Sequence, residues 1–317
     1  MDDKGNIIKI ISSKIHKLSG KIASDIRLGY TGGSTDMYIP NAALGTKIYA
    51  YDVNSLYPYV MKTNKYPVGS PTYFSGNILA DNANAFGFFY CKIIAPEGLK
   101  HPILQTHIKT KDGIRTVAPL GTWEGMYFSE ELYNARNYGY KFEVLWGYTF
   151  DSSNIFQDFV DTFYNLRKSY SKLDPMNLVA KLILNSLYGR IGMDDLFTYI
   201  NIVNKKDYPK FEESIKIKES ILDIIDLGEN YLIQIKNPQV EMKTDLDNGF
   251  ETHNVNISIA AAVTAYARIH MSHFKNNPNY NLYYTDTDSI YIDSPLTEYF
   301  ISSTELGKLK LEGVYVA

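Results

Sequence analysis

Two aspartates two positions apart are the first residues of this sequence that could do chemistry. Asp286 and Asp288 lie between the apolar and aromatic runs LYY and SIYI. Adjacent carboxylates repel each other unless a cation lies between them, and Mg²⁺, which prefers oxygen ligands, would suit such a pair. A solvated turn is the alternative, because Asp and Thr are common turn residues. The flanking runs predict a β-hairpin, and on a strand this spacing would place both carboxylates on one face.

Asp52 is a third carboxylate, at the end of a run from residue 47 in which apolar and polar residues alternate. The alternation predicts a strand. A lone Asp at this position is usually a helix cap or a turn residue, and Pro58 lies where the first turn of a helix tolerates proline. Three acids at the ends of neighbouring strands can hold two Mg²⁺ ions about 3.5–4 Å apart. Such a pair of ions activates an attacking hydroxyl and stabilises a leaving pyrophosphate.

Residues 181–189 place a cation, an amide and an aromatic ring on one face of a predicted helix. Lys181, Asn185 and Tyr188 follow an i, i+4, i+7 spacing, and these groups suit the triphosphate, sugar and base of a nucleotide. The alternative is a plain helix on which the lysine extends along a packed tyrosine.

The elements that must position these residues are helices and antiparallel strands. Residues 154–172 have a helical apolar period, Asp174-Pro175 interrupts it, and a second helix follows that Gly189 could end. Together they predict an αα-hairpin. Residues 256–274 are alanine-rich and predict another helix, whereas residues 66–125 predict strands and loops.

Composition places the chain among ordinary globular proteins. Of 317 residues, 45% are hydrophobic and 21% charged, which excludes disorder as the main state. A single cysteine excludes a disulfide framework, and no apolar run approaches the ~20 residues of a membrane helix, so we expect no membrane partner. A net charge of -3 does not indicate a globally basic nucleic-acid binder.

In this order, the three segments resemble motifs A, B and C of family B DNA polymerases. The patterns are D-x-x-S-L-Y-P, K-x-x-x-N-S-x-Y-G and Y-x-D-T-D-S, and every defining position matches. Tyr30-Thr31-Gly32-Gly33 resembles the Y-x-G-G motif of the protein-primed members, and residues 119–142 also resemble that group. These members are found in linear-DNA phages, adenoviruses and linear plasmids of mitochondria.

The resemblance implies an α+β fold. Its palm would be an antiparallel, ferredoxin-like sheet with helices, and its fingers an αα-hairpin, with two insertions. The implied division is a linker with Y-x-G-G at 1–45, palm at 46–75, a first insertion of the terminal-protein type at 76–150, fingers at 151–189, palm and a second insertion at 190–250, and palm at 251–317.

The resemblance also implies a role for each matching position. Asp52 and Asp288 would be the principal ligands of two Mg²⁺ ions, which Mn²⁺ can replace, with Asp286 and the Val53 carbonyl beside them. Tyr57 would exclude a ribose 2′-hydroxyl by a steric clash. The remaining dNTP-binding residues would be Ser55, Leu56, Arg167, Lys181, Asn185 and Tyr188. The residues touching DNA would be Tyr30, Gly32, Gly33, Gly189, Arg190 and Thr287.

The implied function is DNA-directed DNA synthesis. A primer 3′-hydroxyl, or a hydroxyl of a terminal protein, would attack the α-phosphate of a dNTP on template-primer DNA. Frequent Ile, Tyr, Lys and Asn, which have A/T-rich codons, suggest an A/T-rich genome. Together with the plasmid resemblance, this favours a mitochondrial location, and a viral origin stays open.

The sequence departs from the family pattern at two places. The first glutamate is Glu97, so no D-x-E precedes motif A, and no K-x-Y follows Asp288. We therefore expect this chain to lack the exonuclease and the thumb. The missing motifs leave an alternative function: a truncated, non-catalytic remnant that binds DNA or nucleotide. A two-metal nuclease would share the carboxylates, but it would explain neither Tyr57 nor the Lys181 helix face.

Overall fold

A computed structural model describes residues 16–111, 113–193, 198–215, 221–236 and 255–317 of the chain. The chain divides into two compact units, one of residues 1–192 together with 256–317, and one of residues 193–255. All the candidate site residues belong to the first unit.

The first unit contains a five-stranded antiparallel sheet. Its order is β1 (Thr35–Met37), β12 (Leu282–Asp286), β13 (Ser289–Ile292), β2 (Lys47–Val53) and β14 (Leu309–Val316). The predicted strand ending near Asp52 and the predicted hairpin are both confirmed. Alternation fixes which side of each strand is buried: Ile290 and Ile292 of β13 are fully buried, whereas Tyr291 between them is not.

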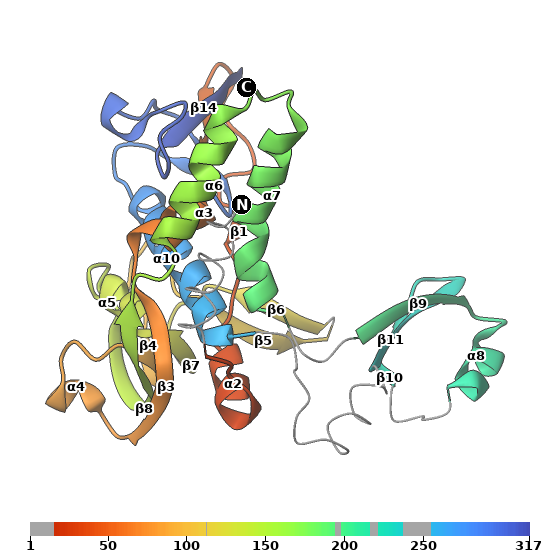
Figure 1. Cartoon of the computed structure of the whole chain (residues 1–317). Coiled ribbons are helices and arrows are strands. Elements are labelled where there is room, and N and C mark those ends of the chain that lie inside the picture. The colour runs from red at the N-terminus through yellow and green to blue at the C-terminus, as the bar shows by residue number, and fades with distance from the viewer. Residues whose placement is uncertain (1–15, 112, 194–197, 216–220, 237–254) are drawn as a thin grey trace. The chain divides into compact units, whose positions relative to one another are not determined.

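Two helices, α6 (Gln157–Ser169) and α7 (Pro175–Ile191), form the predicted αα-hairpin and lie side by side in green in Figure 1. Asp174 caps α7 by accepting a hydrogen bond from the Met176 amide at 2.8 Å, and Pro175 occupies its first turn. The prediction that Gly189 ends this helix was wrong. The helix continues to Ile191, and Gly192 is its C-cap.

The alanine-rich segment forms α10 (Ile257–Lys275), as predicted. It packs against α2 (Gly20–Arg27), α3 (Leu56–Thr63), α5 (Ser129–Arg136) and α7. Small alanine side chains allow this close packing on several sides, and most of the helix is buried. Within the described ranges, no helix has both the length and the apolar character needed to span a membrane.

A second antiparallel sheet, of four strands, packs beside these helices. Its order is β3 (Tyr66–Ser75), β8 (Lys141–Ser153), β4 (Gly87–Ile94) and β7 (Thr122–Phe128). The same segment also contains the short helix α4 (Ile78–Asp81) and a hairpin of β5 (Thr106–Thr110) and β6 (Gly113–Val117). Phe88 of β4 joins the main core, whereas its neighbour Phe89 joins a separate core with Tyr127. The antiparallel strands expected over 66–125 are confirmed. The role of residues 76–150 as an insertion stays a prediction; β3 lies wholly before this range, and β8 extends past its end.

The second unit contains β9 (Thr198–Asn204), α8 (Tyr208–Ser214), β10 (Ile221–Asp226) and β11 (Asn230–Lys236). Its three strands form an antiparallel sheet in the order β10-β11-β9. This is where the sequence places the second insertion, a role that stays a prediction. Parts of the predicted 190–250 segment, and residues 1–15 of the predicted linker, lie outside the described residues. A short 3₁₀ helix, η2 (Glu298–Phe300), completes the described elements.

Candidate active site

The end of β2 and the turn of the β12–β13 hairpin bring Asp52 and Asp288 together. Ser289 lies opposite Asp52 in the sheet, and the Val53 amide donates a hydrogen bond to the Asp288 carbonyl at 2.8 Å. Burial, and after it the negative charge of Asp288, raise the pKa of Asp52 to about 6. Burial also raises the pKa of Asp288. The fold therefore concentrates negative charge at a point where a cation would stabilise it.

Asp286 is oriented differently from the sequence expectation. Strand β12 ends at Asp286 and the chain turns before Asp288, so the two carboxylates do not share one strand face. The Asp286 carboxylate is exposed and accepts hydrogen bonds from the hydroxyls of Thr35, at 2.8 Å, and Thr287, at 3.2 Å. Among the residues that the structure describes, no group of three or more acidic, His or Cys side chains is arranged to hold a metal ion. The side chains that come closest to forming a metal-binding site are thus Asp52 and Asp288. Their oxygen ligands suit Mg²⁺ or Mn²⁺.

Strained backbone occurs in both turns that flank these acids. Ser55, with φ of 52°, and Thr287, with φ of 54°, are the two non-glycine residues with positive φ in the described part of the chain. A β-branched residue such as Thr287 is seldom found in this region of φ/ψ space. Such strain persists only where surrounding contacts impose it, and it gathers at functional sites.

The αα-hairpin faces motif A through specific contacts. The Arg167 guanidinium donates a hydrogen bond to the Ser55 hydroxyl at 3.2 Å. The positive charge of Lys181 opposes the effect of burial on the pKa of Asp52, which places this exposed lysine within electrostatic reach of the carboxylate. Asn185, one turn further along α7, is also exposed.

Tyr57 of α3 and Tyr188 of α7 form the aromatic part of the site. Their ring centroids are 4.2 Å apart with an interplanar angle of 30°. Burial, and then the neighbouring Tyr188, raise the pKa of Tyr57, so the Tyr57 ring is neutral at physiological pH. Leu56, between Ser55 and Tyr57, is fully buried and anchors the start of α3.

The Tyr30–Ser34 loop packs against the hairpin turn. The Thr287 amide donates to the Ser34 carbonyl at 2.9 Å, and a Cβ on Gly33 would lie only 2.7 Å from Thr287 Cγ2. By contrast, a Cβ on Gly32 or on Gly189 would meet nothing within 4 Å. The fold itself therefore needs glycine at 33 but leaves open space at 32 and 189. Tyr30 is partly buried, and Arg190 is exposed next to Gly189.

Sequence reasoning missed Lys310 and Glu312 of β14. Lys310 lies opposite Asp52 in the sheet, and its ammonium pairs with the Glu312 carboxylate at 2.6 Å. Glu312 raises the pKa of Asp52 and Lys310 lowers it, both less than burial does. The run LKLEGVYV has strand-like residues, but its position beside β2 comes from sheet topology, which no local pattern reveals.

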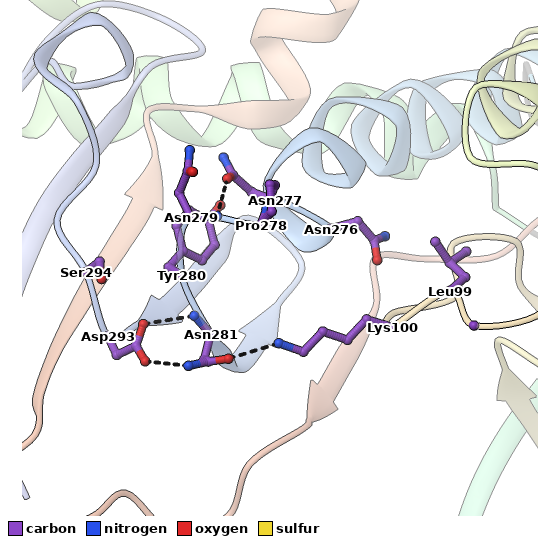
Figure 2. Close-up of a pocket in the computed structure, with 11 residues that line it drawn as sticks. Leu99, Lys100, Asn276, Asn277, Pro278, Asn279, Tyr280, Asn281, Asp293 and Ser294 are labelled. Carbon is purple, nitrogen blue, oxygen red and sulfur yellow. Dashed lines mark hydrogen bonds between the residues drawn. The ribbon is translucent and has the colours of Figure 1, made fainter.

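A cavity lies at the opposite end of the β12–β13 hairpin from Asp288 (Figure 2). Its volume is about 490 Å³. Asn281 donates to Asp293 through both its amide groups, at 2.8 Å each, and accepts from the Lys100 ammonium at 3.0 Å. These groups satisfy one another's hydrogen bonds and link the base of the hairpin to the loop that contains Lys100. The cavity takes no part in the candidate site.

Comparison with known proteins agrees with this geometry. The family model for type B DNA polymerases, organellar and viral, matches residues 4–281. A probable DNA polymerase of Neurospora intermedia is 38% identical over 96% of this chain and 31% of its own length. One of Ascobolus immersus is 35% identical over 98% of this chain and 24% of its own length. The DNA polymerase of Streptococcus phage Cp-1 is 26% identical over 83% of this chain and 43% of its own length.

Solved structures show the same fold. Phi29 DNA polymerase complexed with primer-template DNA matches 98% of this chain, and 50% of that one, with a TM-score of 0.67 at 19% identity. Its ternary complex with incoming nucleotide substrates matches 99% of this chain, and 52% of that one, with the same TM-score. The fold is thus that of a family B DNA polymerase. The chain belongs to the type B DNA polymerases of organellar and viral type, and it spans about a quarter to a third of the length of the two fungal relatives.

Proposed function

We propose that this chain forms the palm and fingers of a template-directed DNA polymerase, which transfers dNMP from a dNTP to a primer 3′-hydroxyl. The observation that supports this most directly is the convergence of Asp52 and Asp288 at the ends of β2 and the β12–β13 hairpin. Partial burial reduces the solvation of both carboxylates in their ionised form. A divalent cation would compensate for this lost solvation.

Asp52, Asp288 and the Val53 carbonyl would hold two Mg²⁺ ions, and Mn²⁺ can substitute for them. Asp286 would act as a third acid near the same turn. When bound, the ions would activate the primer hydroxyl and neutralise charge on the phosphates. The raised pKa of Asp52 fits this role, because a carboxylate that is poorly solvated gains most from a cation.

Residues of motifs A and B would bind the dNTP. Lys181 and Arg167 would neutralise its phosphates, and the amides of Ser55 and Leu56 would donate hydrogen bonds to them. Tyr57 would lie under the sugar and exclude a ribose 2′-hydroxyl. Asn185 and Tyr188 would line the nascent base pair. The contact between the rings of Tyr57 and Tyr188 supports a shared nucleotide site.

A second set of residues would contact the DNA. Tyr30, Gly32, Gly33 and Thr287 would face the template strand, and Gly189 and Arg190 would lie along the DNA backbone. The open space next to Gly32 and Gly189 supports this proposal, because a side chain there would meet no protein atom within 4 Å.

The first primer would be a hydroxyl of a terminal protein, and the replicated element a linear DNA. The Y-x-G-G motif at Tyr30 supports protein priming. Relatives from two fungi and a phage are consistent with an organellar plasmid or viral element, and we propose the mitochondrion as the site of action.

Primer extension tests this function. The chain is incubated with a primed DNA template, dNTPs and Mg²⁺, and an Asp288→Asn variant is the control. We expect extension that the variant loses by at least about 10³-fold, since the substitution removes a charge needed in the transition state. Extension that survives in Asp288→Asn would contradict the proposal. DNA degradation without dNTPs, if dependent on Asp288, would instead indicate a two-metal nuclease. Metal-dependent dNTP binding without extension would support the non-catalytic remnant.

A further inference from the structure

A buried ion pair links α10 to α5, beside the Tyr30–Ser34 loop. Arg268 of α10 and Glu131 of α5 are 7% and 4% exposed. The Arg268 Nε donates to Glu131 Oε1 at 2.7 Å and its Nη2 donates to Oε2 at 2.8 Å. This is the bidentate geometry that makes an arginine–carboxylate pair strong and fixed in orientation.

The same guanidinium holds the loop through its third nitrogen. Arg268 Nη1 donates to the Thr31 carbonyl at 2.6 Å and to the Gly32 carbonyl at 3.1 Å. Two turns further along α10, the Lys275 ammonium donates to the Ser34 hydroxyl. Three of the four positions from Thr31 to Ser34 are thus attached to one buried helix.

The loop in turn holds the turn that contains Thr287. Its Ser34 carbonyl accepts from the Thr287 amide at 2.9 Å, and a Cβ on Gly33 would clash with the Thr287 side chain. Because Thr287 has a positive φ, external contacts must maintain its conformation. A continuous chain of contacts therefore runs from Glu131 through Arg268 and the loop to the residue between Asp286 and Asp288.

We propose that Arg268 is a positioning residue, which holds the Thr31–Ser34 loop against Thr287 and so keeps the proposed template-binding glycines and the acidic turn in register. Glu131 orients the guanidinium for this task. The consequence for DNA rests on the proposed polymerase function, whereas the loop-holding role does not.

Stability alone does not account for this arrangement. A buried ion pair can often be replaced by apolar residues of similar volume without loss of stability. An apolar pair could not donate hydrogen bonds to the Thr31 and Gly32 carbonyls. Replacing both charges therefore separates the loop-holding role from the packing role.

The test uses the full chain with the double substitution Arg268→Met/Glu131→Leu. The matched control is Arg136→Met/Glu130→Leu, which removes the same two charges from α5, where Arg136 lies over the rings of Tyr133 and Phe142. Hydrogen exchange of the Thr287 amide is measured without DNA, together with primer-template affinity by fluorescence anisotropy. We expect the variant to keep the wild-type melting temperature, to exchange about tenfold faster at Thr287 and to bind DNA about tenfold more weakly.

Wild-type exchange at Thr287 in the folded double variant would overturn the proposal. Faster exchange with unchanged DNA affinity would also overturn it, because the loop would then have no consequence for binding. If the double variant does not fold, the proposal is tested with Arg268→Lys, by the exchange rate of the Thr287 amide and the primer-template affinity. One ammonium cannot reach the Glu131 carboxylate and both loop carbonyls at once. A wild-type chain that binds no DNA would contradict the proposed function, and the exchange rate would then decide the loop-holding role by itself.

Discussion

Replacing Asp52 by Asn should stabilise the metal-free protein at neutral pH. The folded protein raises the pKa of Asp52 from its ordinary value of 3.8 to about 6, first through burial and then through the charge of Asp288. Since its folded pKa is raised, the ionised carboxylate opposes folding. This cost is fully present above about pH 6 and disappears below about pH 4, where the group is protonated in both the folded and unfolded states.

The size of the effect follows from the same shift. One pKa unit corresponds to about 1.4 kcal/mol, so the difference between 3.8 and about 6 is worth at most about 3 kcal/mol. Asp52 is partly exposed, and water screens part of that energy, which leaves about 1–2 kcal/mol. For a chain of this length, such a gain should raise the midpoint of thermal unfolding by about 1.5–3 °C.

The assay is urea unfolding of wild type and Asp52→Asn with a metal chelator, at pH 8 and pH 4. Asp151→Asn, an exposed strand residue of β8, is the control. We expect the Asp52 variant to be more stable than wild type at pH 8 and to lose most of this advantage at pH 4. Saturating Mg²⁺ should reverse the order at pH 8, because only wild type gains binding energy from the ion. An equal gain at both pH values, or a loss at pH 8 without metal, would refute the reasoning.

Three other substitutions test separate parts of the argument. Gly189→Ala should raise the unfolding free energy by about 0.5–1 kcal/mol, because this helical glycine has open space beside it; it should also weaken primer-template binding, and unchanged affinity would contradict the proposed DNA contact. Asn256→Ala should cost about 1–2 kcal/mol in urea unfolding, since the side chain accepts from two α10 amides and donates to the His16 carbonyl. Tyr57→Ala should allow rNTP incorporation in primer extension, and unchanged sugar discrimination would exclude Tyr57 as the steric barrier.

The elements around the site could be predicted because each has a strong local signal. Alternation over residues 47–53 and the β-rich runs beside Asp286 gave the strand and the hairpin. Asp174-Pro175 marked the start of α7 correctly, because a capping side chain and a proline both favour a helix N-terminus. Glycine alone was a weaker signal: Gly189 lies inside α7, where the helical hydrogen bonds continue through it.

Long-range contacts were beyond sequence reasoning. The placement of β14 beside β2, which sets Lys310 opposite Asp52, depends on sheet order. The orientation of Asp286 depends on the turn at Thr287, because a spacing of two places side chains on one face only while the strand continues. Arg268 gave no signal, since a single arginine in an alanine-rich run looks like a solvent-exposed residue until the helix is seen to be buried.

The same residues explain why the site is costly to form without its ligands. Asp52 and Asp288 are held partly out of water, and Ser55 and Thr287 adopt backbone conformations that their side chains disfavour. None of these features stabilises the free protein. A buried helix fixes the loop, the loop fixes the acidic turn, and the turn meets β2 through the bond from the Val53 amide to the Asp288 carbonyl. For the proposed function, the site would therefore need little reorganisation on binding a cation and a triphosphate, which is the condition for electrostatic stabilisation of a transition state.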